Sequence, residues 1–315
     1  MIVIGSAILG PSLFSYYFVP DVAWMWTVFF LETFAIQMFQ PSFQALVADS
    51  SGTSSRGKAF GNYNVFWIGS TIPAPLLGGF LIDTVGLRFP FLLASVISLV
   101  GLVTAFGLVE ASHPQTAAHA IASTGDVLVE EPIMPYAQVM LLFGVMAVLN
   151  GLLNGMLSPL LRSYLVYNLH TTATELGLTF SIGSGLVTTL VQIPGGMLTD
   201  SAGRKPLMLF SMLGAPFVVA LAFTGSVSQY ILASAGLVAF GNISGPAYYA
   251  WMMDLVPSAR RARTSGIINT ITGMGMFVGP QLSNWIYESQ GNIVLAFFAT
   301  AMPWILQTPL ILKLK

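Results

Sequence analysis

Residues 195–208 read GGMLTDSAGRKPLM and place one acid, two bases and three glycines between two long apolar runs. Charged residues make up only 7% of the 315-residue chain, against 55% hydrophobic residues, and the mean hydropathy is +0.79. A soluble domain of this length would have too few charges to solvate its surface. Most of the surface must therefore face lipid, and the quoted stretch is interpreted as a short polar loop between two membrane-spanning segments.

The apolar runs are long enough to cross a bilayer as helices. A hydrocarbon core of about 30 Å needs roughly 20 apolar residues per helix, and backbone polar groups in lipid must be satisfied within the segment. We therefore predict an all-α polytopic membrane protein with about ten transmembrane helices. The predicted spans are 1–19, 22–48, 59–82, 89–109, 137–161, 176–198, 206–224, 230–253, 264–287 and 292–312.

One segment differs from the rest in composition. Residues 111–134 are polar, small and acidic at their end, which is typical of a linker between two helical bundles. The predicted organisation is a partial N-terminal bundle of four helices over residues 1–110, a cytoplasmic linker over 111–134, and a C-terminal bundle of six helices over 135–315.

Composition also excludes several classes of function. A net charge of −1 argues against a nucleic acid partner, and the absence of cysteine excludes disulfides and thiolate metal ligands. The three histidines lie in polar stretches and are not spaced to share a metal ion. No nucleotide-binding loop of the GxxxxGK[ST] type is present, so ATP is not the expected energy source. We expect no cofactor and no metal.

The basic residues predict the orientation. If the spans alternate in direction, nine of the eleven bases share one side of the membrane, and the positive-inside rule makes that side cytoplasmic. Arg88 and Arg162 then lie on the other side. Both termini are expected in the cytoplasm, in a chain of the plasma membrane. The nine are Arg56, Lys58, Arg204, Lys205, Arg260, Arg261, Arg263, Lys313 and Lys315.

An internal repeat connects the two halves. Residues 41–61 (PSFQALVADSSGTSSRGKAFG) and 246–266 (PAYYAWMMDLVPSARRARTSG) share an Asp-x6-Arg-x4-Gly spacing at a constant offset of 205. Two related bundles are a plan found in secondary transporters. The offset superposes Pro41 on Pro246, Asp49 on Asp254, Arg56 on Arg261, Gly61 on Gly266 and Pro75 on Pro280.

The repeat leaves residues 137–198 and the quoted loop without a counterpart in the first half. We therefore expect that the chain lacks two helices before its first residue, roughly 70–80 residues at this repeat length. A natural ten-helix form is the alternative.

The motif Gly196-x3-Asp200-x2-Gly203-Arg204-Lys205 resembles the cytoplasmic signature loop of the major facilitator superfamily. In that family the loop joins helices 2 and 3 and recurs between helices 8 and 9. The resemblance implies that the chain corresponds to helices 3–12 of a twelve-helix pattern, with the quoted loop as the second copy. It also implies transport of a small solute by alternating access.

The charges of this loop suggest a cytoplasmic gate. Asp200 ends a helix, where an acid can face the positive N-terminus of a neighbouring helix. Arg204 can pair with Asp254, the acid that the repeat favours, and such a pair could hold the cytoplasmic side shut in one state. Asp49, Arg56 and Arg261 are the repeat-related charges. Solvated anchoring charges are the simpler alternative.

A second motif resembles one in helix 5 of the drug–proton antiporters of this superfamily. It has Ser70 and Ala74 where that motif has glycine, and the second half repeats it. Small residues at this spacing allow close helix packing, and proline bends a helix. Packing between the two halves is the alternative to an exporter motif. The positions are Gly61, Pro75, Gly78 and Gly79, followed by Gly275, Gly279 and Pro280.

Polar residues inside the spans are the candidates for substrate and ion contacts. Glu32 is the one acid well inside a span, where a charge is costly, so it is a candidate for proton coupling or else a hydrogen-bonded packing residue. Gln40 lies two turns further along the same face. A stripe at four-residue spacing in 137–161 and just beyond is expected to face a water-filled cavity. The stripe consists of Asn150, Asn154, Ser158 and Arg162, and Gln192 is a weaker candidate.

The predicted function is secondary active transport, with proton-coupled export of a small organic or drug-like compound as the leading hypothesis. Import of a sugar or an organic anion is one alternative, in which Arg162 could attract the anion rather than extend to the interface. A truncated, non-transporting remnant is another. An enzyme is not expected, because no cluster of acids, histidines or nucleophiles lies at a membrane face. The expected partners are the lipid bilayer, a small solute and protons, in a monomer.

Overall fold

The computed structural model describes residues 1–50, 69–107, 134–201, 203–256 and 260–314. Within these ranges the chain is helical apart from short turns and contains no β-strand. This confirms the all-α prediction. Arg56, Gly61 and nearly all of the predicted linker lie outside the described residues. The chain separates into two compact units: unit 1 comprises Met1–Ser70 and Leu77–Val129, and unit 2 comprises Thr71–Leu76 and Glu130–Lys315.

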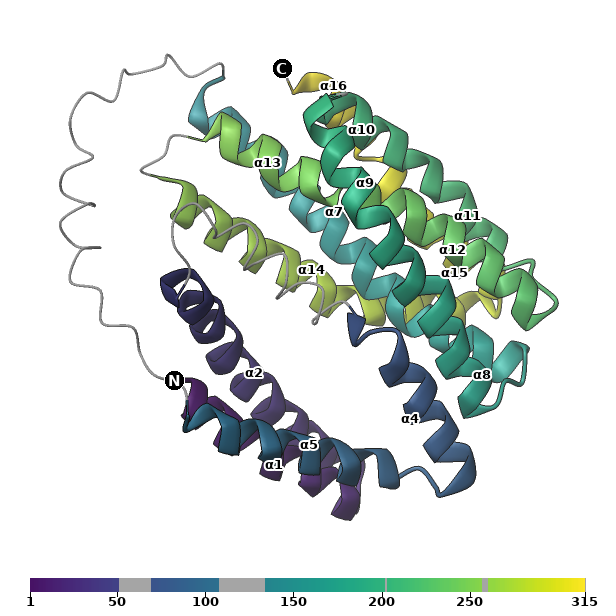
Figure 1. The fold of residues 1–315 in the computed structure, drawn as a ribbon. Coiled ribbons are helices and arrows are strands. Elements are labelled where there is room, and N and C mark those ends of the chain that lie inside the picture. Colours follow the sequence, from purple (N-terminus) through teal and green to yellow (C-terminus); the bar gives the residue numbers. More distant parts are fainter. Residues whose placement is uncertain (51–68, 108–133, 202, 257–259, 315) are drawn as a thin grey trace. The chain divides into compact units, whose positions relative to one another are not determined.

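Unit 1 is built around α1, which packs against both α2 and α5 (Figure 1). Its packing is close at Gly5, where an added Cβ would lie 3.0 Å from the carbonyl oxygen of Ala35 on α2. Most other side chains of α2 remain exposed, as expected for a surface in contact with lipid. The elements are α1 (Ile2–Ser15), η1 (Tyr16–Phe18), α2 (Val22–Ser50), the part of α4 (Pro73–Thr84) that follows Leu76, and α5 (Phe89–Ala105).

Unit 2 holds two long helices, α7 and α14, which run side by side. Several of its helices are interrupted by short 3₁₀ or π segments rather than by loops. The elements are α7 (Tyr136–Ser163), η2 (Tyr164–Asn168), α8 (Ala173–Leu178), η3 (Thr179–Leu186), α9 (Val187–Ser201), α10 (Arg204–Ser211), η4 (Met212–Gly214), α11 (Ala215–Leu221), α12 (Val227–Ile243), α13 (Gly245–Leu255), α14 (Arg261–Gln290), α15 (Ile293–Ile305) and α16 (Thr308–Lys313).

The helices agree with the predicted spans. In the described ranges, each of the ten predicted spans is occupied at least in part by helix. Five helical segments are long and apolar enough to cross a membrane, and three shorter apolar helices accompany them. The five are Val22–Phe39, Tyr136–Asn168, Ala173–Val191, Arg204–Leu221 and Ile293–Lys313, and the shorter ones are Ile2–Phe18, Phe89–Ala105 and Val227–Ile243.

Local sequence signals determine where several helices of unit 2 begin. The Thr172 hydroxyl accepts from the Glu175 backbone N–H and the Glu175 carboxylate accepts from the Thr172 backbone N–H, which forms a capping box for α8. The Asn292 side chain caps α15 through the backbone N–H groups of Val294 and Leu295. These caps satisfy backbone donors at the ends of apolar helices.

The contact between α7 and α14 is a seam of glycines. An added Cβ on Gly275 would lie 2.9 Å from the Cα of Gly151, and one on Gly279 would lie 2.7 Å from the Cα of Gly155. Both distances are shorter than real Cβ contacts, so the two backbones touch where no side chain intervenes. In a membrane such close packing supplies attraction that the hydrophobic effect does not provide between helices. The seam holds α7 in place, and another face of α7 carries the asparagines of the predicted stripe.

Candidate functional site

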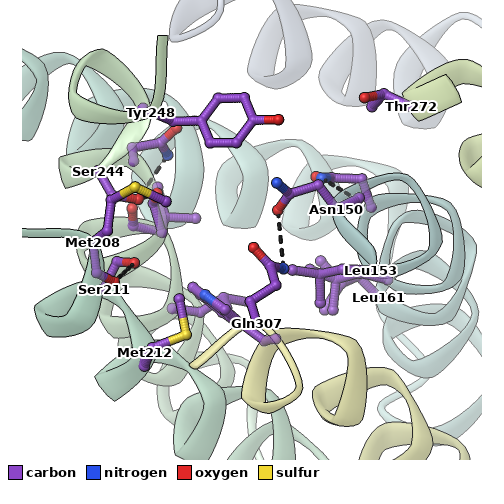
Figure 2. Close-up of a pocket in the computed structure, with 18 residues that line it drawn as sticks. Asn150, Leu153, Leu161, Met208, Ser211, Met212, Ser244, Tyr248, Thr272 and Gln307 are labelled. Carbon is purple, nitrogen blue, oxygen red and sulfur yellow. Dashed lines mark hydrogen bonds between the residues drawn. The ribbon is translucent and has the colours of Figure 1, made fainter. Parts of the chain in front are cut away.

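Unit 2 contains a cavity of about 370 Å³ lined by residues of α7, α10, η4, α12, α13, α14, α15 and the chain between α15 and α16 (Figure 2). Eighteen residues line it, and none of them is acidic, basic or histidine. The apolar part of the lining includes Leu153, Leu157, Met208, Met212 and Trp304. The polar part consists of Asn150, Asn154, Ser211, Asn242, Ser244, Tyr248, Thr272 and Gln307.

Two amides form the centre of the polar lining. The Gln307 side chain is only 2% exposed, and its Nε2 donates to Asn150 Oδ1 at 3.2 Å and to the Pro303 carbonyl at 3.3 Å (Figure 2). Asn154 Nδ2 donates to the Asn150 backbone carbonyl at 2.8 Å. Burial of Gln307 is tolerated because its amide has partners on two helices. The network ties the end of α15 to the middle of α7.

The predicted stripe divides into two parts. Asn150 and Asn154 line the cavity, whereas Ser158 and Arg162 are exposed and do not belong to its lining. The Arg162 guanidinium instead lies 5.9 Å from the centre of the Phe180 ring, a cation–π contact. Four residues turn an α-helix by more than 360°, so residues at four-residue spacing rotate gradually around the helix axis. After two or three such residues, the next one no longer faces the same cavity.

The sequence analysis missed Gln307 as a candidate. Gln307 interrupts the apolar run WILQTPLIL, where an amide inside a span needs a partner, and this signal was available. Nothing in the sequence indicated that the partner would be Asn150, 157 positions away. Gln192 lies in α9 and Gln40 in α2, and neither side chain belongs to the described part of the chain.

The candidate acid of unit 1 has a defined partner. Glu32, on α2, is partly buried, and its Oε2 accepts a hydrogen bond of 2.7 Å from the Tyr16 hydroxyl. The Tyr16 ring packs against Phe91 of α5, with 4.9 Å between the ring centres. Three elements of unit 1 therefore hold this carboxyl in one place. The contact agrees with the hydrogen-bonded packing alternative and leaves the proton-coupling role as a prediction.

The signature loop forms the ion pair that the repeat suggested. Arg204 Nε, at the start of α10, lies 2.6 Å from Asp254 Oδ2 near the end of α13. Gly203, just before α10, has φ = 85°, a backbone conformation that favours glycine and allows the sharp turn into that helix. Lys205 Nζ donates to the carbonyls of Leu312 and Leu314 at 2.8 Å each.

The remaining gate candidates are placed only by their backbone. Gly196 and Asp200 lie in the last turns of α9, Asp49 lies near the end of α2, and Arg261 begins α14. Their side chains are outside the description, so the structure does not test their predicted contacts.

The helix-packing candidates contribute to the packing of their own units. Gly275 and Gly279 pack against α7 within unit 2, which differs from the packing between the two halves offered as the alternative to an exporter motif. Pro75, which belongs to unit 2, approaches Gly177 of α8 through its carbonyl. Gly79 is buried, whereas a side chain on Gly78 would meet open space. Pro280 lies inside α14, directly after the seam.

The chain forms two units of membrane-spanning helices. One unit contains an uncharged cavity, and a charged loop joins two spans. Together these features define a polytopic transport protein of the two-bundle type. The family model of the Major Facilitator Superfamily matches residues 1–148 and, a second time, residues 142–312. The chain belongs to the major facilitator superfamily. The two matches are consistent with the internal repeat.

Similar proteins support this assignment. The chain is 28% identical to "Uncharacterized MFS-type transporter YuxJ" of Bacillus subtilis (strain 168), over 93% of this chain and 77% of that protein. It is also 28% identical to "Tetracycline resistance protein, class H" of Pasteurella multocida, over 47% of this chain but only 36% of that protein. The crystal structure of a variant of the peptide transporter POT covers 99% of this chain and 78% of that chain, with a TM-score of 0.73 at 14% identity. The last likeness concerns the fold.

Proposed function

We propose that the chain is a secondary active transporter that exports a small organic, drug-like compound in exchange for protons. The observation that carries the proposal is the cavity of unit 2, which is large enough for a small solute and combines apolar walls with a few fixed amides. Similarity to a protein named for tetracycline resistance supports export of such a compound. Membership in the superfamily supports movement by alternating access.

Each charged candidate has a separate role in this proposal. Glu32 carries the proton, because it is a carboxyl held inside a span by Tyr16. The Arg204–Asp254 pair closes the cytoplasmic end of unit 2 in one state and opens in the other. Arg204 is 30% and Asp254 52% exposed, so the pair contributes only about 0.2–1 kcal/mol. That amount is too small to hold the fold together and suits a contact that forms and breaks in each cycle.

The proposal includes the orientation given by the basic residues. The loops that hold Arg204, Arg260 and Arg263 face the cytoplasm, both termini lie there, and the protein acts as a monomer in the plasma membrane. The polar segment 111–134 connects the bundle of residues 1–110 to that of 135–315.

A flux measurement with purified chain in liposomes tests the proposal. An uncharged coumarin that carries an acetamide group is loaded into the vesicles and followed by its fluorescence while a proton gradient of either sign is imposed. We expect uphill movement of this compound that a protonophore abolishes. Downhill exchange without response to the gradient would indicate a carrier that is not proton-coupled. No flux of any kind would favour the non-transporting remnant.

A further inference from the structure

We infer that the cavity of unit 2 selects uncharged solutes that carry a carbonyl-type acceptor, and that the amide of Asn150 binds this acceptor. The inference rests on the proposed function, because it names the class of compound that the same cavity would bind. It follows from two properties of the lining: the fixed direction of its amides and the absence of charge among the residues that line it.

The direction of the Asn150 amide is fixed by a chain of hydrogen bonds. Gln307 must direct its NH₂ group toward the Pro303 carbonyl, since a carbonyl can only accept. The same NH₂ group donates to Asn150 Oδ1, so the Asn150 side chain must present its oxygen to Gln307. The Nδ2 of Asn150 therefore keeps its two N–H donors for the cavity. Figure 2 shows this side chain extending into the space that the labelled residues surround.

The side-chain amides of two further asparagines have the opposite orientation, with the NH₂ group directed toward partners in the protein. Asn154 Nδ2 donates to the Asn150 backbone carbonyl, and Asn242 Nδ2 donates to the carbonyl of Val238 and to the Thr188 hydroxyl. Both N–H donors of Asn242 are therefore used, whereas Asn154 uses one of its two, and the Oδ1 atoms of both residues remain as acceptors. The cavity thus offers donors on Asn150 and acceptors on the two other amides. A complementary solute carries a carbonyl or ether oxygen together with an N–H or O–H group.

The uncharged lining is the reason to expect that the cavity selects uncharged solutes over ionised ones. An ionised solute must lose water on entry, and burial of a charge without a partner is costly. The residues that line this cavity offer amides, hydroxyls, thioethers, the aromatic rings of Tyr248 and Trp304, and hydrocarbon, and none of them carries a charge that could act as a counter-ion. An uncharged compound loses less hydration, and Trp304 with the leucines and methionines can cover its apolar surface.

Binding of three related probes to the purified chain tests the inference. The probes are a coumarin with an uncharged acetamide group, the same ring with a carboxylate, and the same ring with a trimethylammonium group. Equilibrium dialysis gives each dissociation constant for the parent chain, for Asn150→Asp and for the control Asn168→Asp. Asn168 is exposed at the end of η2 and does not line the cavity.

We expect the parent chain to bind the acetamide at least about tenfold more tightly than either charged probe. Asn150→Asp replaces the donors with a carboxylate of the same shape, so it should weaken acetamide binding about tenfold and strengthen trimethylammonium binding. This gain cannot come from misfolding. Asn168→Asp should leave the order of the probes unchanged.

Several results would overturn the inference. They are equal binding of the three probes, no binding of any of them, or an order unchanged by Asn150→Asp. A different result would contradict the proposed function alone. In that case the chain binds the three probes in the expected order but shows no proton-driven flux in liposomes.

Discussion

The two units differ in the kind of polar chemistry that they bury. In unit 1 a carboxyl, Glu32, is held by the hydroxyl of Tyr16 at 2.7 Å. In unit 2 an uncharged amide, Asn150, is held by Gln307 at 3.2 Å, and the cavity around it has no ionisable acid, base or histidine in its lining. The difference suggests a division of tasks. A carboxyl can take up and release a proton, whereas fixed amides can recognise a solute at any pH at which the protein is folded.

The units also differ in how closely their helices approach, since the closest backbone contact of an added Cβ in the described part of unit 1, at Gly5, is 3.0 Å. At Gly279 the backbones of α7 and α14 touch, and an added Cβ would lie 2.6 Å from backbone atoms of Gly155 and Met156. At Gly10 of α1 the nearest atom to an added Cβ is the end of the Leu99 side chain, at 3.2 Å. A backbone cannot move aside as a side-chain tip can, so unit 2 is the less tolerant of change at its seam.

Removing the ionisable group of Glu32 is the strongest way to test the comparison. Glu32→Gln keeps the size of the side chain and a hydrogen bond with Tyr16, but it cannot exchange a proton. We expect complete loss of uphill transport with retention of downhill exchange and of probe binding. The measurement is flux of the acetamide-bearing coumarin in liposomes with and without a proton gradient. Glu288→Gln, which changes an exposed acid at the end of α14, is the matched control.

Uphill transport that survives in Glu32→Gln would show that the proton is carried elsewhere. In that case the carboxyl of unit 1 is a packing residue, and the division of tasks between the units is wrong.

Removing the hydroxyl beside this carboxyl gives a smaller effect of the same kind. Tyr16→Phe keeps the ring against Phe91 and deletes the donor to Glu32. Hydrogen bonds to charged groups contribute about 1.5–3 kcal/mol, so we expect proton-driven flux to fall by about tenfold or more. The ratio of uphill to downhill flux separates this from a loss of folded protein. An unchanged ratio would mean that Tyr16 only supports packing.

Two glycine substitutions, one in each unit, test the difference in helix packing between the units. Gly279→Ala forces a methyl group into the seam with α7 and should cost about 1–3 kcal/mol of stability. Gly10→Ala should be neutral or slightly stabilising, because Leu99 can shift and alanine favours the helix. Thermal unfolding followed by tryptophan fluorescence in detergent compares the two variants. A melting temperature of Gly279→Ala equal to that of Gly10→Ala would show that the seam is more adaptable than the distances indicate.

The sequence alone predicted those features that depend on local pattern. Hydropathy was sufficient for an all-α polytopic chain, and the offset of 205 pointed to Asp254 as the partner of Arg204, a pair that the structure contains. Of the four-residue stripe, Asn150 and Asn154 line the cavity, and Ser158 and Arg162 are exposed outside its lining.

Features that depend on long-range packing were out of reach. Gln307 was missed because its contact with Asn150 joins helices that are distant in the chain. The seam was missed in part for the same reason. Gly275 and Gly279 were recognised as packing glycines, but Gly151 and Gly155 complete the contact only once α7 and α14 lie side by side. A sequence shows which residues are small or polar, and the fold decides what each of them meets.

The ion pair of the signature loop should give the smallest effect. Asp254→Asn removes an exposed pair of about 0.2–1 kcal/mol, so we expect the transport rate to change by about twofold to fivefold with no shift in the melting temperature.

Arg204→Asp combined with Asp254→Arg restores the pair with its charges exchanged and should return the rate toward that of the parent chain. Because Asp254 lies in unit 2, the change should leave the ratio of uphill to downhill flux, which we propose depends on Glu32, unaltered. A rate that the charge exchange does not restore would assign these residues to ordinary anchoring at the membrane surface. A large fall in melting temperature would instead make the pair a structural contact rather than a gate.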